Sequence, residues 1–311
     1  MGTLKILVTG AGGSLGAACV EEALARGHAV VALTRHPSEF PSGVTVWTCD
    51  LTDGLPREAL AGVDAVIHTA ASMSNDPATL ERDTIEATKA LCSSIERLPE
   101  RPLVVLASTI LVYDAELAQP VNVDESTALE RRVESREPYL RAKMTQEQCL
   151  QDSGLTTWAL RIGAVYNDGI FWNAHIGFRS GRILVSLGRA GEVPMVHVKD
   201  AASALVNAAQ TKPQGLFEAL NIVEDSLPSR RDVIAALAPA IHLPFHWRLL
   251  MPFAHVVHKL CGPDTPGLLQ PRILRARMAN RTYDNSKAKQ RLGWRPERHF
   301  SASTRTPGRP T

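Results

Sequence analysis

The sequence of 311 residues has few cysteines and no long uncharged apolar run. Its five cysteines are widely spaced and form no CxxC pair, which argues against a disulfide framework and a zinc site. The longest stretches without Lys, Arg, Asp or Glu are 15 residues, Ile6–Val20 and Val233–Trp247. A membrane-spanning helix needs about 18 apolar residues, so no span is expected. Because the N-terminus lacks the pattern of a signal peptide, we expect a cytoplasmic protein.

Charge is unevenly distributed along a chain of ordinary globular composition, with 44% hydrophobic and 21% charged residues. Residues up to Ser229 include 19 basic and 28 acidic side chains, whereas Arg230–Phe300 has 13 basic and 4 acidic ones. A basic segment suits an anionic ligand, an anionic membrane surface or nucleic acid. We favour a solvated face that balances the acidic half. Because no recognition motif accompanies the segment, a nucleic-acid partner is not expected.

Strand-like and helix-like segments alternate along the first 110 residues. The expected strands are Lys5–Thr9, His28–Thr34, Val44–Thr48, Asp64–Thr69 and Leu103–Ala107. The expected helices are Leu15–Arg26 and Thr79–Glu96. Such alternation predicts right-handed βαβ units and an α/β fold, a Rossmann-type doubly wound parallel sheet.

Beyond Tyr166 the pattern loosens, and a smaller discontinuous second domain is expected. Residues 1–166 and 195–213 are assigned to the dinucleotide-binding domain. Residues 167–194 and 214–298 are assigned to a substrate-binding domain. Residues 299–311 lack an apolar anchor and are expected to form a disordered tail.

A glycine-rich segment, Thr9–Gly16, follows the first expected strand and opens the first expected helix. Glycines there let the backbone approach a pyrophosphate, and the helix N-terminus offers unpaired N–H groups. In this strand–loop–helix context, the segment predicts a dinucleotide site.

The residues at the end of the second expected strand indicate which cofactor is bound. NAD sites commonly place Asp or Glu there to bind the ribose 2′-hydroxyl. Here Thr34 and Arg35 take that place, and a hydroxyl and a cation suit a 2′-phosphate. NADP(H) is therefore preferred over NAD(H), the alternative being that Arg35 is an ordinary surface arginine.

A third motif places a tyrosine and a lysine four residues apart, Tyr139 and Lys143, after the helix-starting Pro138. Residues at i and i+4 share a helix face, and an ammonium near a phenol lowers its pKa. The hydroxyl pair Ser108 and Thr109 closes an upstream strand, at the sheet edge where open α/β folds bind ligands. Such a hydroxyl could hold a substrate carbonyl while Tyr139 protonates it.

These three motifs, in this order and spacing, resemble the short-chain dehydrogenase/reductase superfamily. The TGxxGxxG form and the length are similar to its extended (atypical) branch of NAD-dependent epimerases and dehydratases, nearest to 3β-hydroxysteroid dehydrogenase and dihydroflavonol reductase-like members. The resemblance covers residues 4 to 298. Further matching segments are Asp50–Leu51, His68–Ala71, Leu160–Tyr166, Val196–Asp200, Tyr283–Ala288 and Leu292–Trp294.

The resemblance implies a role for each motif. In the family the catalytic hydroxyl stands four residues before the Tyr of a VYG-like turn, here Val112–Asp114, which places it at Thr109 with Ser108 beside the nicotinamide. Tyr139 would be the general acid/base. Lys143 would hold the nicotinamide ribose and lower the pKa of Tyr139.

The resemblance also implies further contacts. Cofactor contacts are expected from Gly10, Gly12, Gly13, Ser14, Leu15, Gly16, Arg35, Asp50, Leu51, Thr69, Ala70, Ala71, Tyr139, Lys143, Ile162 and Ala164. Substrate contacts are expected from Ser72, Met73, Tyr113, Asn173 and Arg179. No metal is expected, because the histidines show no HExxH-like spacing. Members of the family often pair helices into a dimer, which leaves a homodimer open for this chain.

One departure from the family pattern excludes a reaction. Nucleotide-sugar 4,6-dehydratases carry Asp-Glu directly after the catalytic Thr, whereas Ile110 and Leu111 stand here. Two aliphatic side chains cannot act as acid and base for water elimination. Three other departures, at Asp83, Asp114 and Ile162, lie outside the catalytic residues but argue against assigning a substrate by subfamily.

The motifs together predict an NADP(H)-dependent oxidoreductase that interconverts a ketone and a secondary alcohol on a small substrate. The apolar segment Arg248–Val257 suggests an apolar or aromatic substrate, although it equally suits packing of the small domain. Arginines that could meet a diphosphate or carboxylate keep a nucleotide-sugar 4-epimerase or 4-ketoreductase open; they are Arg179, Arg182, Arg272, Arg275 and Arg277. A non-catalytic NADP-sensing regulator is a remoter alternative, because such relatives typically lose the Tyr.

Overall fold

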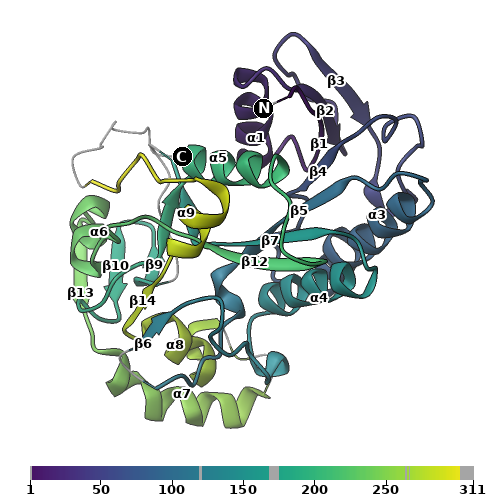
Figure 1. Cartoon of the computed structure of the whole chain (residues 1–311). Coiled ribbons are helices and arrows are strands. Elements are labelled where there is room, and N and C mark those ends of the chain that lie inside the picture. The colour runs from purple at the N-terminus through teal and green to yellow at the C-terminus, as the bar shows by residue number, and fades with distance from the viewer. Residues whose placement is uncertain (1, 119–120, 168–174, 263–264, 266, 302–311) are drawn as a thin grey trace.

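Seven parallel strands form the central sheet and confirm the expected Rossmann-type architecture (Figure 1). The computed structural model describes residues 2–118, 121–167, 175–262, 265 and 267–301. In spatial order the strands are β12 (Phe217–Ile222), β7 (Thr157–Ile162), β5 (Leu103–Thr109), β4 (Ala65–His68), β1 (Lys5–Thr9), β2 (Ala29–Thr34) and β3 (Val44–Thr48). Most of these strands are aliphatic and buried on both faces, as parallel strands covered by helices require.

Helices cover both faces of this sheet. Alternate residues of β1 show the two layers: Ile6 and Val8 pack in one core cluster and Leu7 in the other. Helices α1 (Ser14–Ala25) and α5 (Val198–Ala209) contact each other on the first face. The second face carries α3 (Ala87–Glu96) and α4 (Pro138–Asp152), preceded by α2 (Pro77–Leu80) and a π-helical turn, Glu81–Glu86.

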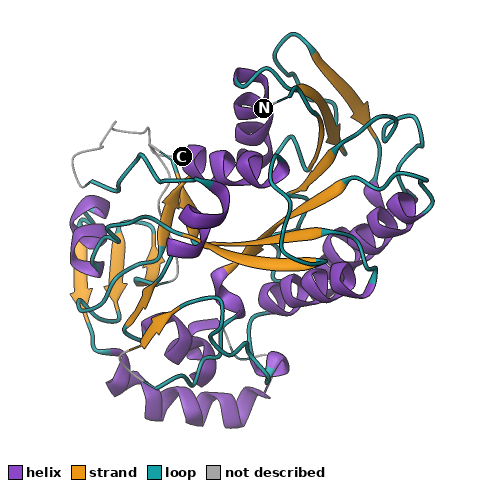
Figure 2. Ribbon diagram, in the orientation of Figure 1, coloured by secondary structure: helices purple, strands orange, loops and turns teal. Residues whose placement is uncertain are grey.

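The remaining elements form a smaller region beside the sheet (Figure 2). Its strands pair as β8 (Ala164–Tyr166) with β11 (Met195–His197), β6 (Val121–Val123) with β14 (Arg281–Tyr283), and β9 (Gly177–Ser180) with β10 (Ile183–Ser186) and β13 (Ile241–Pro244). Its helices are α6 (Arg230–Leu237), α7 (Trp247–Cys261) and α8 (Pro271–Met278), whereas α9 (Ser286–Leu292) packs against α5 and β12 of the central sheet. Short 3₁₀ turns lie at Leu51–Asp53, Ile110–Val112, Val133–Ser135 and Gly267–Leu269.

The segments of the chain interlock more than the expected division implies. β12 pairs with β7 in the central sheet, although residues 214–298 were assigned to the substrate-binding domain. The indole of Trp294, beyond α9, donates to the Asp200 carbonyl at 2.9 Å. Of the expected tail, the Phe300 amide donates to Glu224 at 2.9 Å, while residues 302–311 lie outside the described part of the chain.

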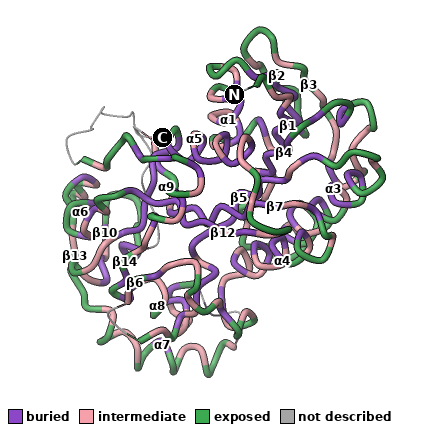
Figure 3. Tube along the Cα trace, in the orientation of Figure 1, coloured by how far each residue is buried: buried purple, intermediate pink, exposed green. Residues whose placement is uncertain are grey.

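Burial follows this layered arrangement (Figure 3). The sheet and the inner faces of its helices are buried, whereas α7 carries several exposed apolar residues along an outer edge of the molecule. Among the described residues, no helix combines the length and the apolar character needed to cross a bilayer.

Candidate active site

The loop between β1 and α1 has the geometry of a phosphate cradle. Gly10 adopts φ +67°, and a Cβ there would lie 2.8 Å from the Ala70 backbone nitrogen. A Cβ on Gly16 would collide with the Gly10 carbonyl. A side chain at Gly10 or Gly16 would therefore clash, so glycine is required where the loop turns and packs against the segment after β4. The N-terminus of α1 follows Gly13 without a side-chain cap, so the N–H groups of its first turn can donate hydrogen bonds to an anion.

A cavity of about 270 Å³ opens beside this loop, at the carboxyl ends of β1, β2 and β4. The expected cofactor and substrate residues that line it are Gly10, Gly13, Arg35, Asp50, Leu51, Thr69, Ala70, Ala71 and Ser72. Thr34 also lines it, and its buried hydroxyl has no hydrogen-bond partner among the described residues. A buried hydroxyl without a partner is costly, so this cavity suits a ligand that offers one, as a dinucleotide does.

Carboxylates surround the arginine that was expected to select the cofactor. The guanidinium of Arg35 pairs with Asp83 at 2.8 Å, and this hydrogen bond raises the pKa of Arg35. Arg82 pairs with Asp83 at 2.8 Å and also with Asp50. Two cations therefore face two carboxylates at this end of the cavity. A 2′-phosphate would have to compete with Asp83 for Arg35.

Helix α4 carries both Tyr139 and Lys143, contacts β5 and the turn after it, and brings Lys143 to the Ala107 carbonyl near the end of β5. The hydroxyl of Tyr139 forms no hydrogen bond with a described residue. Burial raises its pKa to about 12, although Arg277 pulls that value down. The expected lowering of the Tyr139 pKa is therefore not observed. The reason is that burial outweighs the nearby cation, which is Arg277 rather than Lys143.

Lys143 is buried and held by two acceptors. Its Nζ donates to the Ala107 carbonyl at 2.6 Å and to Oε1 of Gln146 at 2.8 Å. Burial lowers the pKa of Lys143 to about 8, against the opposing effect of Glu147. The ammonium is therefore oriented by the end of β5 and by the next turn of its own helix.

A hydrogen-bonded chain continues from Lys143 to the glycine-rich loop. The amide nitrogen of the fully buried Gln146 lies 3.2 Å from His68 Nε2 and also donates to Thr88 at 2.7 Å. His68 Nδ1 in turn lies 2.7 Å from the hydroxyl of Thr9. Burial and the charge of Lys143 lower the pKa of His68 to about 3, so its imidazole is neutral. The two motifs thus belong to one polar network.

The hydroxyls at the end of β5 have separate partners. Ser108 donates to the buried carboxylate of Glu147, which also pairs with Arg161 at 2.9 Å. The hydroxyl of Thr109 accepts from the Leu111 amide at 3.3 Å. Ser108 is therefore tied into a buried ion pair, whereas the Thr109 hydroxyl caps the following 3₁₀ turn.

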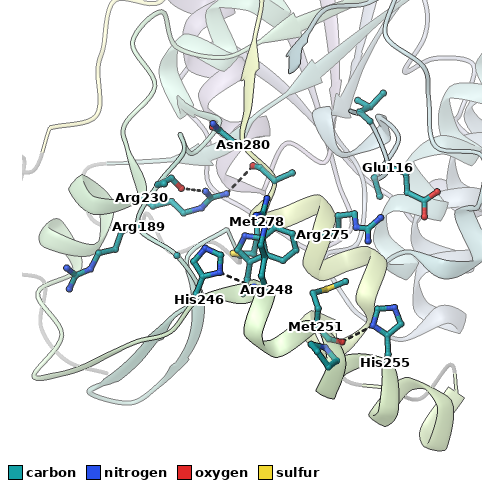
Figure 4. Close-up of a pocket in the computed structure, with 17 residues that line it drawn as sticks. Glu116, Arg189, Arg230, His246, Arg248, Met251, His255, Arg275, Met278 and Asn280 are labelled. Carbon is teal, nitrogen blue, oxygen red and sulfur yellow. Dashed lines mark hydrogen bonds between the residues drawn. The ribbon is translucent and has the colours of Figure 1, made fainter. Parts of the chain in front are cut away.

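A second cavity of about 850 Å³ lies in the smaller region, between α7, α8 and the segment after Tyr113 (Figure 4). Trp247, Met251 and Met278 contribute apolar surface to it. Its cationic side chains are Arg189, Arg230, Arg248 and Arg275. Its one acidic lining residue, Glu116, pairs with Arg272 at 2.6 Å.

Arg230 is the least ordinary of these cations, because it is 2% exposed and has no carboxylate partner among the described residues. It donates to four backbone carbonyls, among them His175 at 3.0 Å and Arg277 at 2.9 Å. Burial lowers its pKa to about 10. Arg189, Arg248 and Arg275 also form no ion pair with a described residue. This cavity therefore carries uncompensated positive charge.

Several expected contacts lie elsewhere. Tyr113 is fully buried, and its hydroxyl donates to Asn221 at 2.6 Å. Met73 is 78% exposed, and Arg179 lies on the outer hairpin β9–β10. Neither cavity is lined by Gly12, Ser14, Leu15, Gly16, Ile162, Ala164, Ser108, Thr109, Tyr139 or Lys143. Asn173 lies outside the described residues.

The arginines expected to meet an anionic substrate divide into two groups. Arg272 pairs with Glu130 at 2.6 Å, and Arg277 pairs with Glu137 at 2.9 Å, so both are neutralised. Arg275, on the same helix, lines the second cavity. Sequence spacing alone gives no sign of this division, because all three stand within six residues of α8.

Residues that the sequence did not single out complete the site. Gln146 and Glu147 follow Lys143 at i+3 and i+4, a spacing that could have placed them on the same helix face. Arg230 and Trp247 have no local signal, because the cavity they line forms only when α6, α7 and α8 pack together. Among the described residues, no cluster of His, Cys, Asp and Glu could hold a metal ion.

Comparison with known proteins identifies the family and the fold. A family model described as the NAD dependent epimerase/dehydratase family matches residues 6–222. A 3-diazoavenalumate denitrifying reductase from Streptomyces sp is 29% identical, with 94% of this chain and 96% of that protein covered. A 3-beta-hydroxysteroid dehydrogenase from Mycolicibacterium neoaurum is 26% identical, with 94% and 87% covered. The solved structure of MoeE5 in complex with UDP-glucose and NAD shares the fold, with a TM-score of 0.72, 22% identity and 96% of each chain covered.

Proposed function

The chain belongs to the NAD-dependent epimerase/dehydratase family of extended short-chain dehydrogenases/reductases, and on that premise we propose that it interconverts a ketone and a secondary alcohol. The observation that carries the proposal is the hydrogen-bonded chain from Thr9 through His68 and Gln146 to Lys143. It joins the phosphate cradle to the helix that bears Tyr139. Hydride transfer to a carbonyl requires the cofactor and the proton donor to be held in fixed positions, and this network fixes the helix that carries Tyr139 relative to the glycine-rich loop.

The cofactor of the proposal is NADP(H). The glycine-rich loop would hold the pyrophosphate, and Thr34 would use its unpaired hydroxyl at the adenosine end. Arg35 is half exposed beside the same cavity and would exchange Asp83 for the 2′-phosphate. When bound, the nicotinamide supplies or takes up the hydride.

The chain's own residues would handle the proton. With a pKa near 12, Tyr139 is protonated at neutral pH and would donate its hydroxyl proton to the carbonyl oxygen during reduction. Thr109, at the end of β5, would hydrogen-bond the same oxygen. Lys143 would stabilise the phenolate left on Tyr139, after moving from the Ala107 carbonyl toward the nicotinamide ribose.

The second cavity defines the substrate of the proposal. Its apolar wall of Trp247, Met251 and Met278 suits an apolar or aromatic body. Its uncompensated arginines, including Arg230 and Arg275, suit a carboxylate or another anionic group. We infer a small apolar or aromatic ketone that carries negative charge away from the reacting carbon.

A nucleotide-sugar 4-epimerase or 4-ketoreductase is the second candidate, favoured by the same cationic cavity, since a diphosphate would also meet these arginines. The candidates differ in how they treat the cofactor. An epimerase regenerates its nicotinamide in each cycle and needs none added, whereas a reductase releases and rebinds it.

Cofactor binding separates these candidates experimentally. Purified protein is first checked for retained nicotinamide and then titrated with NADPH and NADH by nicotinamide fluorescence. The proposal expects protein free of cofactor and tighter binding of NADPH. Retained nicotinamide, or a preference for NADH, would overturn it and favour the epimerase.

A further inference from the structure

The outer side of α7 carries an exposed apolar stripe. Leu249, Phe253, Val256 and Leu260 are 71%, 55%, 57% and 79% exposed. Their spacing of i, i+4, i+7 and i+11 places them on one side of the helix. The second cavity lies against another side, which is lined by Trp247, Met251 and His255. The stripe is therefore separate from the candidate substrate site.

The small sheet next to α7 adds a second apolar surface. In its register Ile183 lies opposite Ile241, and Val185 lies opposite both Leu243 and Phe178, so these five side chains share one face. Four of them are 36% to 51% exposed, whereas Leu184, on the other face, is buried. Val185 packs against the cluster that includes Trp247 and Leu250 of α7. At Val185 the sheet face therefore meets the inner side of α7 near its first turn, where Trp247 also lines the second cavity.

The charged residues of these elements are all basic. The segments 177–186 and 241–261 contain Arg179, Arg182, Arg248 and Lys259, and no Asp or Glu. Figure 1 shows α7 along an outer edge of the molecule, at the far end from the first strands of the sheet. An apolar surface whose own segments carry only basic charges matches the chemistry of an anionic lipid surface, in which acyl chains lie beneath negative headgroups.

We propose that this face, formed by the outer side of α7 and the exposed side of β9–β10–β13, attaches the protein to the surface of an anionic membrane. Leu249, Phe253 and Leu260 would enter the boundary between headgroups and acyl chains. Arg182 and Lys259 would bind the phosphate groups above it. The helix would lie in the plane of the surface without crossing it.

Charge favours lipid over a second copy of the chain. A two-fold symmetric contact through this face would bring the cations of one copy, Arg179, Arg182, Arg248 and Lys259, to the same interface as those of the other, with no carboxylate in these segments to balance them. An anionic bilayer supplies the missing negative charge. Self-association through α7 is therefore treated as an outcome that contradicts the proposal.

Cosedimentation with vesicles tests the attachment. The full chain is mixed with vesicles of phosphatidylcholine alone or of phosphatidylcholine and phosphatidylglycerol in equal amounts, at low and high salt. We expect binding to the phosphatidylglycerol vesicles that weakens with salt. The substitutions Leu249→Gln, Phe253→Gln and Leu260→Gln together should weaken binding at least about tenfold. The pair Arg182→Glu and Lys259→Glu should weaken it about tenfold or more.

Control variants replace other exposed residues outside this face. Leu216→Gln with Val46→Thr controls the apolar substitutions, and Arg57→Glu with Arg101→Glu controls the charge changes. These variants should bind the vesicles like the unaltered protein, and NADPH titration checks that all variants are folded. Absence of binding to phosphatidylglycerol vesicles, or equal binding of the Leu249, Phe253 and Leu260 triple variant, would overturn the proposal. So would a dimer in light scattering that this triple variant converts to a monomer.

Discussion

The two cavities differ most in how their charges are balanced. Beside the glycine-rich loop, Arg35 and Arg82 pair with Asp50 and Asp83, so cations and carboxylates match. In the second cavity, the buried Arg230 is held by four backbone carbonyls and has no carboxylate partner in the described part of the chain. In the first cavity the 2′-phosphate of the proposed NADP(H) would therefore have to displace a carboxylate from Arg35, whereas an anionic substrate in the second cavity would meet cations that have no carboxylate partner among the described residues. This contrast underlies our proposed assignment of the first cavity to the cofactor and of the second to the substrate.

Loss of the proposed proton donor, Tyr139, should have the largest effect. Tyr139→Phe removes the hydroxyl while keeping the ring, so we expect the turnover number to fall about a thousandfold. NADPH affinity should stay within about twofold, because the glycine-rich loop binds the cofactor. Steady-state kinetics and fluorescence titration measure the two quantities. Equal losses of turnover and cofactor binding would assign Tyr139 to the cofactor cleft instead.

Protonation of Lys143 should set the alkaline limit of reduction. Its pKa of about 8 lies well below that of Tyr139, about 12, so Lys143 loses its proton first as the pH rises. We expect kcat/KM for reduction to fall about tenfold per pH unit above pH 8, because the neutral amine no longer stabilises the Tyr139 phenolate. A pH–rate profile tests this. A profile flat to pH 10 would exclude Lys143 as the titrating group.

A buried ion-pair cluster, in which Glu130 pairs with Arg136 before α4 and with Arg272 of α8, links the smaller region to the start of α4. This cluster should control the stability of the fold at acidic pH. Burial raises the pKa of Glu130, but hydrogen bonds from the Arg132 amide and from Arg136 outweigh it and hold the value at about 2. Since this is below the unfolded value, the stabilisation is present above about pH 4.5 and is lost as the pH falls toward 2. The loss should be about 3 kcal/mol in the free energy of unfolding, measured by urea denaturation.

Two substitutions compare how much this buried cluster and an exposed ion pair contribute to the free energy of unfolding. Glu130→Gln leaves Arg136 and Arg272 short of negative charge and should cost about 3 kcal/mol at neutral pH. The control, Glu134→Gln, removes the carboxylate that pairs with Arg141. Because the Glu134 side chain is 81% exposed, this change should lower the free energy of unfolding by less than about 0.5 kcal/mol. Similar effects of the two substitutions would show that the cluster does not stabilise the contact between regions.

Charge in the second cavity should act on the substrate and not on the cofactor. Arg275→Gln should raise KM for an anionic substrate about tenfold, with little change in NADPH affinity. Arg57→Gln, at an exposed position outside both cavities, is the control. A change in NADPH affinity without a change in KM would contradict the proposal that this cavity binds the substrate and not the cofactor.

The smallest expected effect concerns cofactor choice. Asp83→Asn frees Arg35 from its carboxylate partner and should tighten NADPH binding about fivefold, whereas Arg35→Ala should weaken it. NADH binding should change less than about twofold in both variants, because NADH lacks the 2′-phosphate. Fluorescence titration measures the affinity of each variant for NADPH and for NADH. Parallel changes for NADPH and NADH would remove Arg35 from the phosphate site.

The sequence predicts the glycine-rich loop and its cavity far better than the second cavity, for a physical reason. The phosphate cradle is local, since Thr9–Gly16 is one continuous turn whose glycines are required by the approach of Ala70. The strands are also local and match the expected runs within about two residues. The cavity around Arg230 is assembled from α6, α7 and α8. Its charge depends on which arginines find carboxylates, as Arg272 does and Arg275 does not.

Burial explains the other differences from the expected site. The Tyr139–Lys143 spacing predicts a shared helix face, and both residues lie on α4. Spacing alone cannot show that burial raises the Tyr139 pKa, or that Ala107 and Gln146 hold the lysine. Tyr113 was expected at the substrate but is buried, because its hydroxyl completes a network with Asn221 and Arg161.

The most direct test of the account compares turnover of two matched ketones, an aryl ketone bearing a carboxylate and its methyl ester. NADPH consumption is followed for the unaltered protein and for Tyr139→Phe. The account predicts a kcat/KM at least about tenfold higher for the carboxylate, lost in the Tyr139 variant. Equal rates for acid and ester, or turnover that persists without the Tyr139 hydroxyl, would contradict it.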